Sequence, residues 1–216
     1  MTGLRAQNKA DRTRRILESA SRLFRESGFD AVRIEDIALD AQMSPGTVYN
    51  YFSTKGDVLL AIVAMEVEEV LIAGEALVAN PEGGFDGAMT KLIGGYYDHS
   101  LKYLSKAMWR TAMAQSIAHP ETAFSRHYTE LDQRLTDQIG ALIMKLQSRG
   151  DLRTDLEPKV LGVIIFNDIN LMFVEFVKNE NASLKTLRRV LKTHLRQFAL
   201  LLHPSPDAHE TERDTQ

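Results

Sequence analysis

Apolar residues return every three or four positions along most of this chain of 216 residues. The stretch 184–202 shows the pattern most clearly, since one face collects Leu184, Leu187, Leu191, Leu195, Phe198 and Leu202. This is the spacing of an amphipathic α-helix, and no stretch has the strict alternation of a β-strand. The sequence therefore predicts an all-α fold of about nine helices.

Capping residues and chain breaks set the expected ends of these helices. We expect Gly28 to close the first helix in a left-handed conformation, with Phe29 folded back on the last turn. Thr54 and Asp57 have the spacing of a capping box, and Pro158 suits the first position of a helix. The expected helices span about 9–27, 34–41, 45–52, 54–79, 85–103, 105–118, 121–149, 158–177 and, after the cap Ser183, 184–202.

The third of these helices is short and rich in hydrogen-bond donors and aromatic rings. Ser44 is a good N-cap, and Pro45 stands at the first helical position, where a missing N–H has no cost. Val48 and Phe52 are four residues apart and are expected to face the first helix. The positions that remain outward are Tyr49, Asn50 and Tyr51.

Several motifs in the first sixty residues lie in the register of one family. They are Arg15-Ile16-Leu17, Ala20, Leu23-Phe24, Gly28-Phe29, Ile37-Ala38, the run from Ser44 to Phe52, Lys55 and Asp57-Val58-Leu59. On these residues the segment resembles the TetR family of one-component repressors, and the rest of the chain matches only in layout. The resemblance implies a helix-turn-helix DNA-binding domain over 1–56 and a ligand-binding and dimerisation domain over 57–203. The polar, Pro-containing stretch 204–216 is expected to be a disordered tail.

A recognition helix enters the DNA major groove, about 12 Å wide, with its first turns against the base edges. Gly46 has no side chain to clash there, and the resemblance implies that Tyr49 and Tyr51 contact phosphates or bases. Asn50 is our candidate for reading an adenine. Lys55 is expected to hold a phosphate at the start of the next helix. The candidate DNA-binding residues are Arg33, Pro45, Gly46, Thr47, Tyr49, Asn50, Tyr51 and Lys55.

Arg33 departs from the family pattern, which usually has Thr or Ser at this helix cap. Either Asp30 or a water caps that end, or Arg33 exchanges capping for a phosphate contact. Tyr49 and Tyr51 have an alternative interpretation as partly buried core residues. Arg12, Arg14 and Arg15 are candidates for contacts to the flanking DNA backbone, or are simply a solvated face.

The net charge of −3 hides an asymmetry along the chain. Residues 1–56 carry nine Lys or Arg against seven Asp or Glu, whereas the rest carries 17 against 22. A mildly basic head on an acidic body suits a protein whose head meets phosphate.

Two heads are generally needed for a usable operator affinity, so we expect a homodimer on double-stranded DNA with an inverted repeat. The apolar stretch 158–177 and the leucine stripe of 184–202 favour a four-helix interface between two subunits. Burial of both helices in their own core is the alternative.

The resemblance places a pocket for a small-molecule effector of unknown identity among the middle helices. Its candidate lining is Tyr96, Tyr97, Trp109, Met113, Phe124, His127 and Tyr128, together with Asn167 and Asn170. Polar residues inside the apolar stretch 158–177 need partners, so Asn167, Asp168 and Asn170 serve either this pocket or the dimer interface.

Other chemistry has little support in the sequence. Cysteine is absent, no two of the six histidines have the i, i+4 spacing of a helical metal site, and no catalytic motif is present. We therefore expect no enzyme, no metal and no cofactor.

No signal peptide is visible and charged or amide residues interrupt the most apolar stretch, so a cytoplasmic protein with no membrane contact is expected. The alternatives are an architectural DNA-binding protein without a ligand, or an all-helical small-molecule-binding protein or enzyme.

Overall fold

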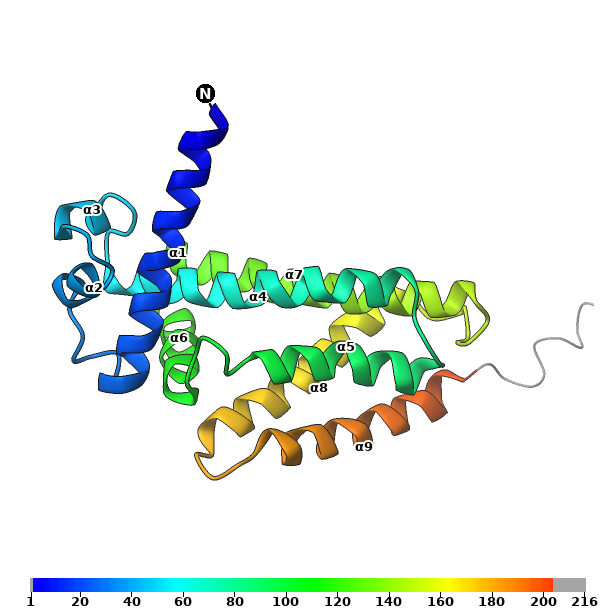
Figure 1. Ribbon diagram of the computed structural model, residues 1–216. Helices are drawn as coiled ribbons and strands as arrows, with labels where there is room; N and C mark the ends of the chain where they lie inside the picture. Colours follow the sequence, from blue (N-terminus) through cyan, green and yellow to red (C-terminus); the bar gives the residue numbers. More distant parts are fainter. Residues whose placement is uncertain (1, 204–216) are drawn as a thin grey trace, which may run out of the picture. The chain divides into compact units, whose positions relative to one another are not determined.

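The computed structural model describes residues 2–203, with side chains from residue 6 onward, and the expected tail at 204–216 lies outside these residues. The described residues form nine α-helices and no strand, which confirms the predicted all-α fold (Figure 1). The helices are α1 (Thr2–Ser27), α2 (Ile34–Asp40), α3 (Pro45–Tyr49), α4 (Lys55–Ala79), α5 (Phe85–His99), α6 (Lys106–Ala118), α7 (Ala123–Ser148), α8 (Pro158–Lys178) and α9 (Leu184–Leu202).

The helices are distributed over two compact units. Of the described residues, the first unit takes those up to Glu68 and His99–Leu131, and the second takes Glu69–Asp98 and those from Asp132 on. The first unit therefore holds α1, α2, α3, α6 and the beginnings of α4 and α7, and the second holds most of α5, the remainder of α4 and α7, and α8 and α9.

The core of the first unit is built from the apolar stripes that the sequence shows. Ile16, Ala20 and Phe24 of α1 are buried, and so are Ile37 and Ala38 of α2. The expected closure of α1 is confirmed: Gly28 has a φ of +85° and its N–H donates to the carbonyl of Phe24 at 3.0 Å. Phe29 packs on Phe24 with ring centroids 5.1 Å apart, so α1 ends in the turn that leads to α2.

The core of the second unit lies among α5, α7, α8 and α9, where Ile93, Ile139, Leu142, Ile165 and Leu191 are buried. α8 is long and apolar enough to cross a membrane by length and composition, but 39% of its most apolar window is buried in the fold. Four other apolar side chains of α8 form an exposed stripe at Val160, Val163, Ile164 and Leu171.

Three expected helix ends were wrong by three residues or more. α1 begins at Thr2 instead of near Lys9, α3 stops at Tyr49 instead of continuing to Phe52, and α5 stops at His99 instead of continuing to Tyr103. The α5 helix stops because the carbonyls of its last residue and of the next residue have other partners. The indole of Trp109 donates to the carbonyl of Ser100 at 2.7 Å, and the backbone N–H of Lys102 turns back to His99 at 2.8 Å. A carbonyl bonded in this way no longer needs a helical N–H partner.

Candidate nucleic-acid interface

The turn between α2 and α3 is closed by a Schellman motif with an unusual residue at its centre. The N–H of Met43 donates to the carbonyl of Ala38 at 2.8 Å, and the N–H of Gln42 donates to Leu39 at 3.1 Å. Gln42 has a φ of +56°, the left-handed conformation that this motif requires and that glycine normally provides. The turn therefore sets the direction in which α3 leaves α2.

α3 shows the expected cap and buries one side only. The Ser44 hydroxyl accepts from the N–H of Thr47 at 3.2 Å, and Pro45 occupies the first turn. Val48 is completely buried, whereas Tyr49 is 47% exposed and Pro45, Gly46 and Asn50 are exposed as well. The outward face of α3 thus combines a phenol, a carboxamide and a bare glycine, which suits close approach to a polar surface such as a DNA groove.

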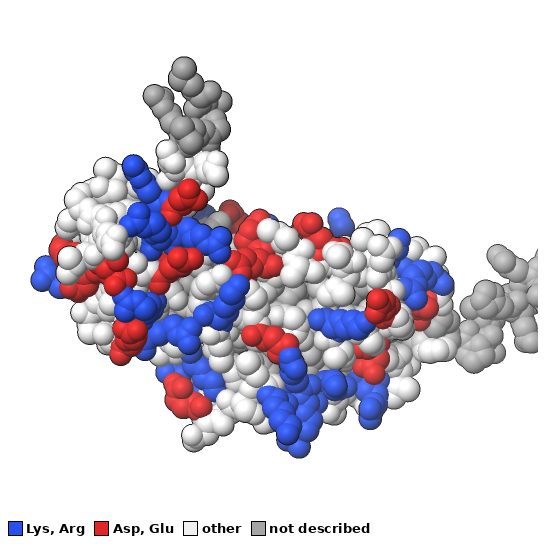
Figure 2. Space-filling view, viewed as in Figure 1, with Lys and Arg blue, Asp and Glu red and all other residues white. Residues whose placement is uncertain are grey.

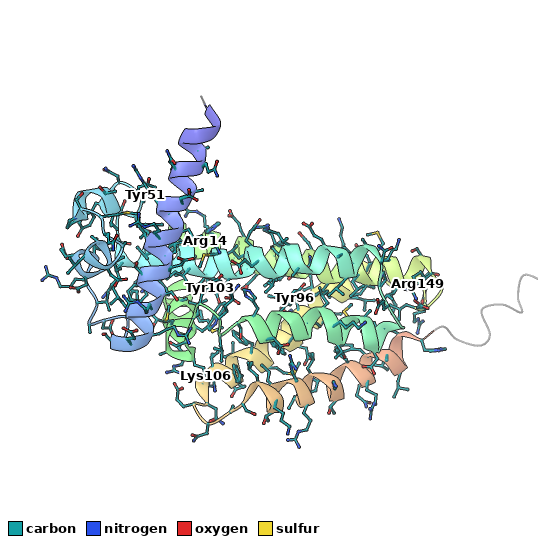
Figure 3. All side chains as sticks on the ribbon, viewed as in Figure 1. Arg14, Tyr51, Tyr96, Tyr103, Lys106 and Arg149 are labelled. Atoms are coloured by element: carbon teal, nitrogen blue, oxygen red, sulfur yellow. The ribbon has the colours of Figure 1, made fainter. Side chains whose placement is uncertain are left out.

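Two further candidates of this segment are less free than the sequence indicated. The Thr47 hydroxyl lies 2.8 Å from that of Ser44 and is therefore shared with the cap. Tyr51 follows α3 and is only partly exposed, with its ring centroid 6.5 Å from that of Phe52 (Figure 3).

Arginines of α1 hold α2 in place. The guanidinium of Arg15 donates to the carbonyl of Ala41 at the end of α2, at 2.6 Å. Arg22 forms an ion pair with Asp40, and the contact lowers the pKa of that carboxyl. A cation at a helix C-terminus meets the negative end of the dipole, so both arginines stabilise the docking of α2 on α1.

The N-terminus of α2 is capped by a carboxylate of the same helix. The side chain of Arg33 accepts nothing, but its backbone N–H donates to the Asp36 carboxylate at 2.8 Å, which is half of a capping box. The guanidinium of Arg33 lies 3.4 Å from Glu35, and its side chain is 74% exposed. Arg33 therefore reaches outward from the start of α2, beside an acidic neighbour.

Lys55 connects the start of α4 to the loop after α1. Its ammonium donates to the carbonyls of Phe29 at 2.6 Å and Asp30 at 3.0 Å, and lies 4.5 Å from the centroid of the Phe29 ring. The predicted capping box at the same helix end is confirmed, with Thr54 and Asp57 exchanging bonds of 2.8 and 3.1 Å. The geometry gives Lys55 an intramolecular role that the sequence did not indicate.

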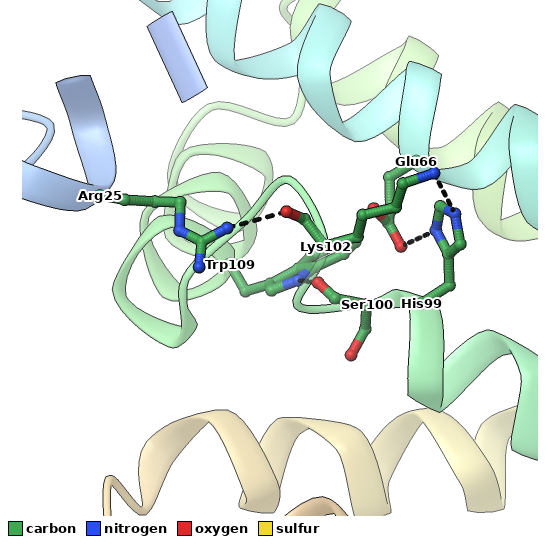
Figure 4. A network of polar contacts seen from close by, with 6 residues as sticks. All are labelled: Arg25, Glu66, His99, Ser100, Lys102 and Trp109. Atoms are coloured by element: carbon green, nitrogen blue, oxygen red, sulfur yellow. Dashed lines mark hydrogen bonds and ion pairs between the residues drawn. The ribbon is translucent and has the colours of Figure 1, made fainter. Parts of the chain in front are cut away.

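The loop between α5 and α6 ties the far end of α1 to the rest of the first unit (Figure 4). Arg25 donates to the carbonyl of Lys102 at 2.8 Å. The Lys102 ammonium lies 3.3 Å from Nε2 of His99, whose Nδ1 lies 2.6 Å from the buried carboxylate of Glu66 on α4. A polar chain thus runs from α1 through this loop to α4.

The predicted pocket residues divide between the two units. In the first unit, Trp109 is buried, Met113 is partly exposed, Phe124 stacks on Tyr128 at 6.5 Å, and His127 is exposed beside Glu130. In the second unit, the buried Tyr96 donates to Gln138 at 2.6 Å, and Gln138 donates to the carbonyl of Leu71 at 2.8 Å. Burial also raises the pKa of Tyr96 and of Tyr97, whose hydroxyl donates to the carbonyl of Ile169 at 2.8 Å.

The polar residues of α8 have different surroundings. Asp168 lies 2.9 Å from Nδ1 of His194 and so links α8 to α9. Asn167 is exposed and lies in the same stripe as Ile164 and Leu171, whereas Asn170 is partly exposed. Within the described part of the chain, no group of three or more His, Asp or Glu is arranged to hold a metal ion.

Residues 16–62 match the model of bacterial regulatory proteins of the tetR family. The repressor KstR of Rhodococcus jostii is 28% identical over 158 residues, which are 72% of this chain and 66% of the repressor, just under two thirds of its length.

Solved structures share the fold. A TetR-family transcriptional regulator from Mesorhizobium loti superposes with a TM-score of 0.72 at 20% identity, over 90% of this chain and 98% of that one. Thermus thermophilus FadR, a TetR-family repressor solved with lauroyl-CoA, gives a TM-score of 0.63 at 22% identity, over 90% and 97% of the two chains. The capped α2–turn–α3 segment lies inside residues 16–62, the part of the chain that matches the tetR family of bacterial regulatory proteins.

Proposed function

We propose that this regulator is a homodimeric repressor that binds an inverted-repeat operator and releases it when a small molecule binds. The outward face of α3 carries the proposal. A fixed scaffold of buried Val48, the Ser44 cap and the Gln42 turn presents exposed Tyr49 and Asn50 side by side. In this reading Asn50 bonds an adenine edge, Tyr49 contacts the neighbouring backbone, and Gly46 lets the helix approach.

The exposed stripe of α8 supports the homodimer. Ile164 and Leu171 are 48% and 61% exposed, and Asn167 lies between them in the i, i+3, i+4 series of one helix face. An apolar stripe of this kind is costly to leave in water, and the same stripe from a second subunit would cover it. We therefore propose that Asn167 belongs to the dimer interface and not to the ligand pocket.

A small-molecule effector is supported by the relatives. FadR from Thermus thermophilus was solved with lauroyl-CoA, so a chain of this fold takes up an organic ligand there. We propose that this chain also binds a small organic ligand, whose chemical identity we do not assign. We further propose that the protein acts in the cytoplasm and has no catalytic activity. The DNA-binding domain is proposed to be 1–56 and the ligand-binding domain 57–203.

Selection of genomic DNA fragments by the purified full chain tests the proposal. We expect the bound fragments to share an inverted repeat, because two symmetric heads read two half-sites. Asn50→Ala should weaken binding to that repeat by about tenfold or more, the value of one bidentate base contact. Arg126→Ala, an exposed residue of α7, is the matched control and should bind as the unaltered protein does.

Enrichment of fragments without any common sequence would contradict the repressor and favour an architectural DNA-binding protein. No DNA binding at all would contradict both.

A further inference from the structure

A cleft opens in the second unit between α5 and α9, with the end of α4 at one side. Its volume is about 1190 Å³, which is large enough for an organic molecule of drug size. None of the aromatic residues predicted to line an effector pocket borders it. The cleft is therefore a separate feature of the fold.

Two adjacent glycines leave part of the cleft free of side-chain atoms. Gly94 and Gly95 of α5 both border the cleft, and a Cβ added to either would meet no atom within 4 Å. Glycine inside a helix costs roughly 1 kcal/mol relative to alanine. Neither glycine has a positive φ or a close neighbour that excludes a side chain, so helix geometry and packing give no reason for the pair. The leucines Leu77, Leu184 and Leu191 supply the rest of an apolar floor.

The rim of the cleft is strongly cationic. Five Lys or Arg side chains and one carboxylate, Asp98, are among the residues that line it. Arg188 pairs with Asp98, and Lys91 pairs with Glu82 outside the cleft. Lys185, Arg189 and Lys192 are exposed, and among the described residues no carboxylate pairs with them. Figure 2 shows the resulting concentration of basic side chains over α9.

The cleft lies on the flank of α9 that faces α5, away from the proposed dimer surface. At 3.6 residues per turn, Arg188 and Lys192 stand on one side of the buried leucines and His194 and Leu201 on the other. The Arg188–Asp98 pair marks the first side as the α5 side, and the His194–Asp168 pair marks the second as the α8 side. A dimer made through α8 and the adjacent flank of α9 leaves the cleft open.

We propose that this cleft binds an anionic amphipathic small molecule, one with an apolar chain and a carboxylate or phosphate head. The apolar part lies over Gly94 and Gly95, and the head is held by Arg189 and Lys192. Guanidinium and ammonium groups both bind such anions by charge-assisted hydrogen bonds, and the apolar floor favours a ligand with an apolar chain to bury. The proposal concerns ligand binding only and does not rest on operator binding.

Calorimetric titration of the full chain without DNA tests this site at physiological salt. The probes are decyl phosphate, decanoate and decyltrimethylammonium, each below its micelle concentration. Both anions are expected to bind at least tenfold more tightly than the cation of equal chain length. Tighter binding of one anion identifies the head group that the site prefers. Equal binding of the cation overturns the proposal.

Substitutions in the cleft test whether the anionic probes bind there. Gly95→Leu fills the cleft and favours the helix, so it should fold and lose anion binding by at least tenfold. The double variant Arg189→Glu, Lys192→Glu changes only surface charge and should lose a similar factor. Arg196→Glu is the matched control, because Arg196 is exposed on the same helix but does not line the cleft. If Gly95→Leu and the double variant both bind decyl phosphate as the unaltered protein does, the cleft is not the site.

Discussion

Gln42 has a left-handed backbone conformation in the turn between α2 and α3, at a position where glycine is usual. A non-glycine residue in the left-handed region costs about 1–2 kcal/mol, and the two hydrogen bonds of the Schellman motif keep it there. The cost falls on the segment that orients α3, so the helix that we propose reads DNA follows a strained turn.

Replacing Gln42 with glycine should therefore stabilise the protein. Gly adopts this φ without the Cβ clash, and its greater freedom in the unfolded chain offsets part of the gain. We expect Gln42→Gly to raise the free energy of unfolding by roughly 0.5–1 kcal/mol in urea denaturation. Gln42→Ala keeps the Cβ and is the control; a gain as large for alanine would mean that the turn is not strained.

Asp132 makes stability depend on pH. Burial raises the pKa of its carboxyl from 3.8 to about 7, so the folded protein keeps a proton that the unfolded chain releases between these values. The contribution of this residue is thus most favourable below about pH 4 and is lost as the pH rises to 7. One pKa unit is worth about 1.4 kcal/mol, so the total is on the order of a few kcal/mol.

Asp132→Asn removes this titration. The variant should melt several degrees above the unaltered protein at pH 8 and close to it at pH 4, as measured by circular dichroism. Asp137→Asn, at an exposed position of the same helix, should show no such dependence on pH. An Asp132→Asn protein that follows the unaltered one at every pH would contradict the assignment.

At the scale of helices, local signals predicted most of the fold. The caps at Ser44 and Thr54, the left-handed Gly28 and the apolar stripes are properties of neighbouring residues, and the structure has them where the sequence places them. The end of α5 could not be predicted, because Trp109 takes the carbonyl of Ser100 from outside that helix. Contacts between distant segments leave no periodic trace in a sequence.

The same limit applies to the candidate DNA-binding residues. The exposed positions Tyr49 and Asn50 follow from helix periodicity around Val48. The partners of Lys55 are backbone carbonyls some 25 residues earlier, and any residue type supplies a carbonyl. No side-chain pattern could therefore have shown that this lysine connects α4 to the loop after α1.

Lys55→Ala should consequently destabilise the first unit. It removes two charge-assisted hydrogen bonds and the contact with the Phe29 ring, and we expect a loss of roughly 1–3 kcal/mol in the free energy of unfolding. Arg33→Ala, on an exposed side chain, should change stability by less than about 0.5 kcal/mol. If Lys55→Ala has unchanged thermal stability, the intramolecular role is contradicted and the phosphate contact expected from the sequence is favoured.

At the scale of the molecule, the exposed stripe of α8 determines the expected assembly. Leu171→Glu places a charge in the centre of the proposed four-helix interface and should convert the dimer to a monomer in sedimentation velocity. Ile117→Glu is the control, because Ile117 is 81% exposed and belongs to α6, a helix of the first unit. A monomeric unaltered protein, or a dimeric Leu171→Glu variant, would argue against this interface.

The intramolecular bonds of Arg15, Arg22 and Lys55 also bear on how the protein responds to salt. Each cation that neutralises a DNA phosphate releases counterions and steepens the plot of log affinity against log salt concentration by about 0.9. Because these three cations already bond within the protein, they should release few counterions, and operator binding should vary less with salt than the basic residues of the head suggest. Titrations between 50 and 200 mM salt, about the range in which phosphate contacts dominate affinity, would measure this slope directly. A regulator of this kind would keep much of its operator occupancy when the ionic strength of the cell rises.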